Sequence, residues 1–139
     1  MKDLGNATTS WAQVISEADG LLGVSEFSSI PFVPQRFFWL ASIKGDSIRA
    51  DHAHRTCHQM LICLAGSLTA TVTTFKDAAI VHRMSTGTSV YLPPLNWLVL
   101  TDFTPDAVLG VIASEPYDSR EYITSKHELS ALWHSTHND

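Results

Sequence analysis

Short apolar runs separated by turn residues fill the chain from Phe37 onward. The runs cover residues 37–43, 60–64, 68–73, 79–84, 89–92, 97–101 and 108–113. Turn-forming pairs lie between them, among them Gly45-Asp46, Gly66-Ser67 and Pro93-Pro94. In the third run apolar residues alternate with threonines, which is typical of a strand with one wet face. Many short strands at regular spacing predict an all-β fold, a sandwich or a barrel.

The C-terminal segment follows a helical period instead. Ser125 precedes Glu128 by three residues, which is the spacing of a capping box. Leu129, Leu132 and Trp133 then recur at i, i+3 and i+4. This pattern predicts one short helix whose apolar stripe packs on the strands or on a partner.

Composition places the chain among compact globular domains. It has 139 residues, of which 45% are hydrophobic, so it can bury a core. Residues 1–10 are small and polar and predict a flexible tail. No repeat or linker interrupts the rest, so we expect a single domain over residues 11–139.

Charge and cysteine content narrow the class of protein. The net charge is −5, whereas a nucleic-acid surface needs a basic stripe. The N-terminal residues lack a secretory signal, and no apolar stretch is long enough to cross a bilayer. Cys57 and Cys63 make no disulfide framework and fit a reducing compartment. We therefore expect a cytoplasmic protein that binds neither nucleic acid nor membranes.

Two histidines two residues apart are the main candidates for chemistry. On a strand, His52 and His54 point to the same face. Their spacing to Gln59, and to a glycine seven residues further on, resembles the first motif of metal-binding cupins. In those proteins a glutamate takes the place of Gln59 and a later histidine that of Leu98. Two imidazoles are too few for a divalent metal, so we expect no metal and no other cofactor.

Proton transfer is a second interpretation of the same pair. Histidine titrates near neutral pH, so it can take a proton next to a carbonyl and return it. A neighbouring cation such as Arg49 would stabilise the enolate or enediolate oxygen. The alternative is that His52 and His54 are hydrogen-bonded polar groups of the core.

Further motifs occur in a fixed order along the chain. They are Asp19-Gly20-Leu21-Leu22, Ile30-Pro31-Phe32 with Arg36, the run from Arg49 to Arg55, His58-Gln59, Gly66-Ser67, Leu92-Pro93-Pro94 with Trp97, and Tyr117-Asp118 with Glu121-Tyr122-Ile123. Over roughly residues 15–130 this series resembles the sugar 3,4-ketoisomerase cupins of the WxcM-like family.

The resemblance implies a cupin (jelly-roll) barrel and a reaction. Members of this family convert dTDP-4-keto-6-deoxyglucose to a 3-keto sugar through an enediol without a metal, in deoxysugar synthesis for surface polysaccharides or antibiotics. By resemblance, His52 and His54 are the acid/base pair, and Arg49 and Gln59 orient sugar oxygens or phosphates. The resemblance also implies a homodimer that exchanges N-terminal strands.

Three more residues are candidates for substrate binding, and two other functions stay open. Arg36 would pair with a phosphate or form a surface salt bridge. Tyr91 is expected to face the cavity, and Trp97 to stack on a sugar or thymine ring or to seal the barrel end. The stretch Phe37–Ala41 lacks the family's tyrosines, which leaves open a non-catalytic nucleotide-sugar-binding cupin. A metal-dependent cupin oxygenase is the other alternative.

Overall fold

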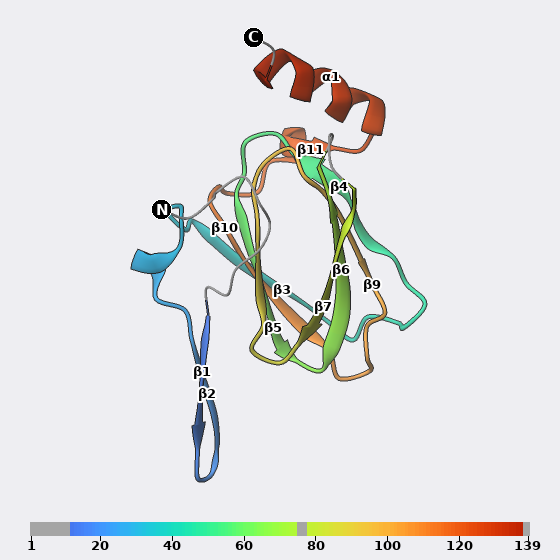
Figure 1. Cartoon of the computed structure of the whole chain (residues 1–139). Coiled ribbons are helices and arrows are strands. Elements are labelled where there is room, and N and C mark those ends of the chain that lie inside the picture. Colours follow the sequence, from blue (N-terminus) through green and yellow to red (C-terminus); the bar gives the residue numbers. More distant parts are fainter. Residues whose placement is uncertain (1–11, 75–77, 138–139) are drawn as a thin grey trace.

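Two β-sheets face each other and enclose the core in the computed structural model, which describes residues 12–74 and 78–137 (Figure 1). One sheet has the strand order β3–β10–β5–β8, and the other has the order β11–β4–β9–β6–β7. The strands are β3 (Arg36–Ala41), β4 (Arg49–His54), β5 (Gln59–Ala65), β6 (Ser67–Thr73), β7 (Ile80–Ser85), β8 (Ser89–Leu92), β9 (Trp97–Thr101), β10 (Val108–Ala113) and β11 (Tyr122–Ile123). The prediction of an all-β barrel is confirmed. The predicted tail, residues 1–10, lies outside the described residues.

The strands lie close to the apolar runs that predicted them. β8, β9 and β10 begin and end at the predicted residues, and β3, β5, β6 and β7 differ by one or two residues. The alternating side chains of β6 pack between the sheets, as the period of two requires. One detail of that pattern is wrong, because Thr69 is buried rather than wet and its hydroxyl accepts a hydrogen bond from Arg83.

A β-hairpin at the N-terminus is an element that the apolar runs did not predict. It consists of β1 (Gln13–Glu17) and β2 (Gly20–Val24), with Glu17 paired to Gly20. Its turn is Ala18-Asp19, directly before Gly20, and an aspartate followed by glycine is a common turn signal that could have located the hairpin. The hairpin projects away from the barrel (Figure 1), and several of its apolar side chains are exposed.

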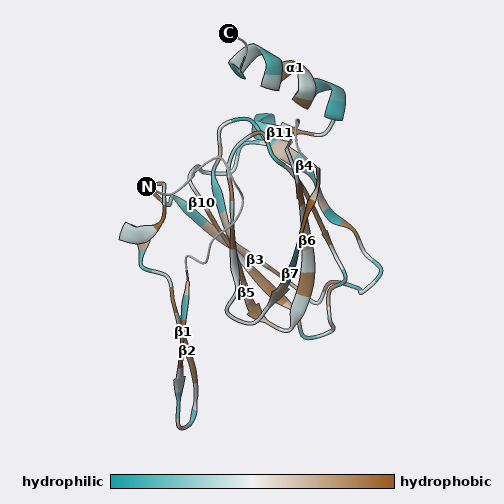
Figure 2. Cartoon of the chain, viewed as in Figure 1, coloured by the Kyte–Doolittle hydropathy of each residue, from teal (hydrophilic) through white to brown (hydrophobic). Residues whose placement is uncertain are grey.

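Hydrophobic side chains gather in three places. The main cluster fills the space between the sheets and includes Leu61, Leu68 and Leu109. A second cluster covers the outer face of the β3–β10–β5–β8 sheet. Ile30 and Phe32 contribute to it from the N-terminal arm, which is the segment between β2 and β3 (residues 25–35). A third lies at one end of the barrel. Figure 2 shows hydrophobic positions along the strands of both sheets.

The C-terminal helix α1 (Lys126–His137) closes that end of the barrel. Ser125 accepts a hydrogen bond from the backbone N–H of Glu128 at 3.2 Å, which confirms the predicted cap. The Glu128 carboxylate does not return to Ser125 as in a full capping box but accepts from Arg55 Nη2 at 2.6 Å. Leu129 is buried in the third cluster, with Leu132 and Trp133 against it. No helix of the described segments is long and apolar enough to cross a membrane.

Candidate active site

A cavity of about 310 Å³ lies between the two sheets. The five-stranded sheet contributes Arg49, Ala50 and His52 from β4, Leu98 and Leu100 from β9, and Tyr122 from β11. The four-stranded sheet contributes Phe38 and Leu40 from β3, Gln59 and Leu61 from β5, and Val111 from β10. Most of the wall is therefore apolar, and its few polar groups converge from both sheets, as in small-molecule sites.

His52 enters the cavity beside an irregularity in β4. Its Nδ1 donates a hydrogen bond to the carbonyl oxygen of Ala50 at 2.9 Å. Burial lowers the pKa of His52, while the Ala50 carbonyl and the Asp51 carboxylate act in the opposite direction. Because a carbonyl only accepts, this bond places the proton of a neutral His52 on Nδ1 and leaves Nε2 as an acceptor.

His54 lies next to His52, with 5.0 Å between the ring centroids. Its side chain is only 3% exposed, and neither ring nitrogen has a hydrogen-bond partner among the described residues. Burial, the neighbouring His52 and Arg36 lower the pKa of His54 to about 4, although Glu121 opposes the shift. His54 is therefore neutral at pH 7. An unpartnered buried imidazole is unusual in a core and fits a group that exchanges protons with a ligand.

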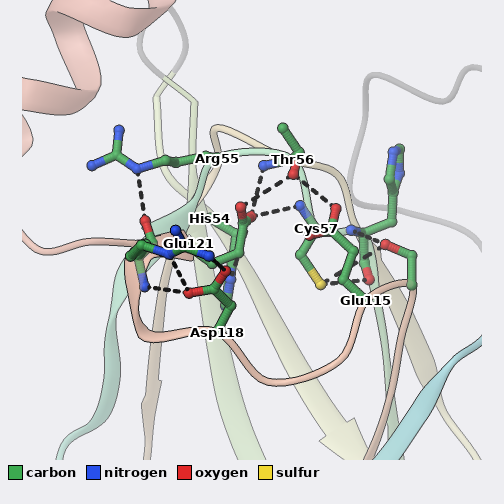
Figure 3. Close-up of polar contacts among 10 residues, drawn as sticks. His54, Arg55, Thr56, Cys57, Glu115, Asp118 and Glu121 are labelled. Atoms are coloured by element: carbon green, nitrogen blue, oxygen red, sulfur yellow. Dashed lines mark hydrogen bonds and ion pairs between the residues drawn. The ribbon is translucent and has the colours of Figure 1, made fainter.

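Glu121 holds the chain segment that follows His54 (Figure 3). Its Oε1 accepts hydrogen bonds from the backbone N–H groups of Thr56 and Cys57, both at 2.7 Å. The same oxygen lies 4.0 Å from His54 Nδ1. In the sequence, Glu121 was marked only as part of the Glu121-Tyr122-Ile123 motif. It fixes the β4–β5 connection by charge-assisted hydrogen bonds and places a negative charge near His54.

Tyr122 is a second residue for which the sequence pattern predicted no role. It pairs with His54 in the β11–β4 ladder, and its ring centroid lies 4.7 Å from both His52 and His54. It also lines the cavity. Tyr122 therefore packs against both imidazoles and shields them from water. The Glu121-Tyr122-Ile123 motif was the signal in the sequence that could have identified Tyr122. A two-residue strand is too short to show an alternation of apolar and polar residues, so its direction could not be predicted.

The other predicted polar residues divide by position. Arg49 and Gln59 line the cavity from opposite sheets. Arg36 is not part of the cavity wall. Its guanidinium carbon lies 5.0 Å from the ring centroid of Phe38, a residue that does line the cavity. The Nε of Arg36 is buried without a hydrogen-bond partner in the described structure. The predicted acid/base pair thus lies in one region with Arg36, Arg49 and Gln59.

Tyr91 does not face the cavity, so that expectation is wrong. It is 1% exposed and belongs to the cluster on the outer face of the four-stranded sheet. Its hydroxyl bonds His58 Nδ1 at 2.7 Å, and Phe32 lies over both rings. Every residue of β8 is buried, so alternation along that strand could not tell its two faces apart. Tyr91 anchors the N-terminal arm.

Trp97 does not line the cavity either, and of its two predicted roles the structure favours sealing the barrel end. It is 5% exposed and packs with Leu95, Ile123 and Leu129 below α1. Its indole Nε1 donates to Asp51 Oδ1 at 3.0 Å. Trp97 is therefore joined to the β4 irregularity through Asp51.

The arrangement suits proton transfer next to a carbonyl. Two neutral imidazoles lie together in an apolar site, with a cation and an amide on the wall to stabilise a developing oxyanion. Within residues 12–74 and 78–137, no three His, Cys, Asp or Glu side chains lie close enough to hold a metal ion. Glu121 is the acidic group beside His54, and its Oε1 is engaged by backbone N–H groups.

Comparisons with known proteins agree with this geometry. The model of a family described as "FdtA: WxcM-like, C-terminal" matches residues 6–134. The TDP-4-oxo-6-deoxy-alpha-D-glucose-3,4-oxoisomerase of Aneurinibacillus thermoaerophilus is 31% identical over 121 residues, which is 85% of each chain.

Solved structures show the same fold. A histidine-to-asparagine mutant of the 3,4-ketoisomerase QdtA from Thermoanaerobacterium thermosaccharolyticum, in complex with TDP-4-keto-6-deoxyglucose, superposes with a TM-score of 0.87 and 28% identity. The match covers 96% of this chain and 98% of QdtA. The 3,5-epimerase RmlC from Legionella pneumophila is 12% identical with a TM-score of 0.67, over 81% of this chain and 68% of RmlC. That likeness shows the shared cupin barrel.

Proposed function

Since this chain belongs to the FdtA family of WxcM-like, C-terminal proteins, we propose that it is a nucleotide-sugar 3,4-ketoisomerase. It moves the keto group of a dTDP-4-keto-6-deoxyhexose from carbon 4 to carbon 3. The observation that carries the proposal is the contact between two imidazoles of lowered pKa: His52 is half-buried on the cavity wall with Arg49 and Gln59, and His54 is buried directly behind it. Relatives that act on or bind this class of sugar support it.

The reaction needs two proton transfers and no oxidant. A base removes the proton on carbon 3, the C–H electron pair forms the C3=C4 double bond, and the carbonyl oxygen on carbon 4 takes a proton. The hydroxyl on carbon 3 of this enediol then loses its proton, a carbonyl forms there, and carbon 4 receives a proton. His52 and His54 are the acid/base pair for these steps.

The remaining polar groups orient the sugar and its phosphates. Arg49 and Gln59 line the cavity from opposite sheets and would hold the enediolate oxygens. Arg36 would meet a phosphate, for which guanidinium is well suited. The cavity is at the small end of the roughly 300–1,000 Å³ range of ligand sites, which fits the sugar rather than a whole nucleotide sugar.

The test is turnover of dTDP-4-keto-6-deoxyglucose followed by NMR. We expect the wild-type chain to form a 3-keto sugar, and His52→Asn and His54→Asn each to slow it at least about 100-fold. His127→Asn, on the exposed face of α1, is the matched control and keeps the wild-type rate. A non-catalytic binding cupin would bind the nucleotide sugar and form no product.

A homodimer with exchanged N-terminal strands is part of the proposal. A groove of about 470 Å³ runs between the hairpin and the outer sheet face, lined by apolar residues such as Val14, Leu21 and Phe37. Trp39, next to this face on β3, is 62% exposed. Apolar surface of this kind on one chain is typical of an interface. Sedimentation should give a dimer for the wild-type chain and a monomer for Trp39→Ser, with Ile48→Ser as an exposed control.

The proposed activity also implies a biosynthetic pathway and a cellular location for the protein. A 3-keto deoxysugar is an intermediate on the way to the amino or acylated sugars of surface polysaccharides or antibiotics. Cys57 and Cys63 are both free thiols, and burial raises the pKa of each. Such cysteines suit a cytoplasmic enzyme. Residues 11–139 act as one catalytic domain.

A further inference from the structure

The β4 strand carries an extra residue immediately before His52. In the ladder with β9, Ala50 pairs with Val99 and His52 with Leu98, so Asp51 is left over as a bulge. Ala50 and Asp51 have φ angles of 65° and 59°. A non-glycine residue seldom adopts this left-handed region, because its Cβ then comes too close to the following carbonyl oxygen. Two such residues in succession persist only where the surroundings hold them.

The surroundings that hold this bulge belong to the closed end of the barrel. Trp97 Nε1 donates to Asp51 Oδ1 at 3.0 Å. The indole ring is fixed in turn, because it packs on Leu129 of α1 and lies 5.4 Å from the Lys126 ammonium. Beyond the bulge, the backbone N–H of Leu95 donates to the His54 carbonyl at 2.8 Å. Both flanks of His52 are therefore anchored on the same packed cluster.

The bulge determines which way the Ala50 carbonyl points. That oxygen accepts the hydrogen bond from His52 Nδ1 at 2.9 Å across only two residues. A regular β-strand aims its carbonyls at the neighbouring strands, so this short-range bond depends on the left-handed backbone. The carbonyl and the Asp51 carboxylate also both act to raise the pKa of His52 against the effect of burial.

We propose that Asp51 and Trp97 are positioning residues for the isomerase reaction. Their hydrogen bond holds the bulge whose Ala50 carbonyl fixes the tautomer and ring orientation of His52. The proposal rests on the proposed function, because it assigns the pair a role through His52. Groups that orient a reacting imidazole in this way typically change activity about 10- to 100-fold when they are lost.

The experiment separates positioning from simple support of the fold. Trp97→Phe keeps an aromatic ring in the cluster and removes the donor, whereas Asp51→Ala removes the acceptor without touching the cluster. Asp51→Asn keeps a carbonyl oxygen and serves as the conservative rescue. The readouts are the ¹⁵N shifts of the His52 imidazole in the free protein, and kcat and KM with dTDP-4-keto-6-deoxyglucose.

We expect wild type and Asp51→Asn to carry the proton on Nδ1 of His52. Asp51→Ala and Trp97→Phe should show mixed tautomers, with kcat lowered about 10- to 100-fold and KM changed less than about threefold. An unchanged His52 tautomer in Asp51→Ala overturns the proposal, even if the variant is less stable. If His52→Asn turns over normally, the role of His52 in the reaction fails, and the tautomer measurement still decides whether Asp51 and Trp97 orient the ring.

Discussion

Lowering the pH should destabilise the fold through His54. Its pKa falls from 6.5 to about 4 because the ring is buried and because His52 and Arg36 oppose its protonation. An unfolded chain protonates His54 near pH 6.5, whereas the folded chain resists protonation down to about pH 4. Acid therefore favours the unfolded state, and stability from this group is present above about pH 6.5 and lost as the pH falls.

The size of the effect follows from the shift. Each pKa unit corresponds to about 1.4 kcal/mol, so the complete loss below pH 4 approaches about 3 kcal/mol. Between pH 7 and pH 5, the contribution of His54 to the free energy of unfolding should fall by about 2 kcal/mol. Burial also lowers the pKa of His52 and His58, so these residues add to the decline of the wild-type chain with the same sign.

A comparison with His54→Gln isolates the contribution of this residue. Urea unfolding at one fixed protein concentration gives the free energy of unfolding at pH 7 and pH 5. The drop should be about 2 kcal/mol smaller in His54→Gln than in the wild-type chain, and unchanged in the control His127→Gln, whose side chain is exposed. An equal drop in wild type and His54→Gln would refute the claim that His54 is buried in its neutral form.

Three further predictions concern the surroundings of the pair. Glu121→Ala leaves the buried Cys57 N–H unpaired and the exposed Thr56 N–H to water, and should lower stability by about 1–3 kcal/mol in thermal unfolding. Glu115→Ala removes one acceptor of the Thr56 hydroxyl, whose contact with Glu121 Oε2 at 3.1 Å remains. It should cost under about 1 kcal/mol, and equal losses would contradict this reasoning. Ala50→Gly relieves a left-handed φ and should raise the free energy of unfolding by about 0.5–1 kcal/mol, whereas a loss would argue against the bulge. Dialysis against a chelator should leave turnover unchanged; a loss restored by a divalent metal would favour a metal-dependent cupin.

Local patterns predicted the strands and the polar residues of the cavity. The apolar runs and turn residues located β8, β9 and β10 because each is short, buried and bounded by turns. The HxH step placed His52 and His54 together because the period of two holds over that step. The cupin spacing then placed Gln59 on the facing sheet.

The parts of the site that could not be predicted from the sequence depend on contacts between residues far apart in the chain. Tyr122 and Glu121 reach the histidines through a two-residue strand that pairs with β4 from more than sixty residues away. Tyr91 lies on a strand buried on both faces, so its alternation carried no information about direction. The β4 bulge, which joins Trp97 to His52 through Asp51, depends on two left-handed residues with no glycine to mark them.

The central claim is that the two histidines move protons on a keto sugar. The most direct measurement is NMR of dTDP-4-keto-6-deoxyglucose incubated with the protein in deuterated water. We expect a 3-keto product with deuterium at carbon 4, and no such product with His54→Asn. Tight binding of the sugar by the wild-type chain, with carbon 3 still carrying protium and the keto group still at carbon 4, would contradict the account.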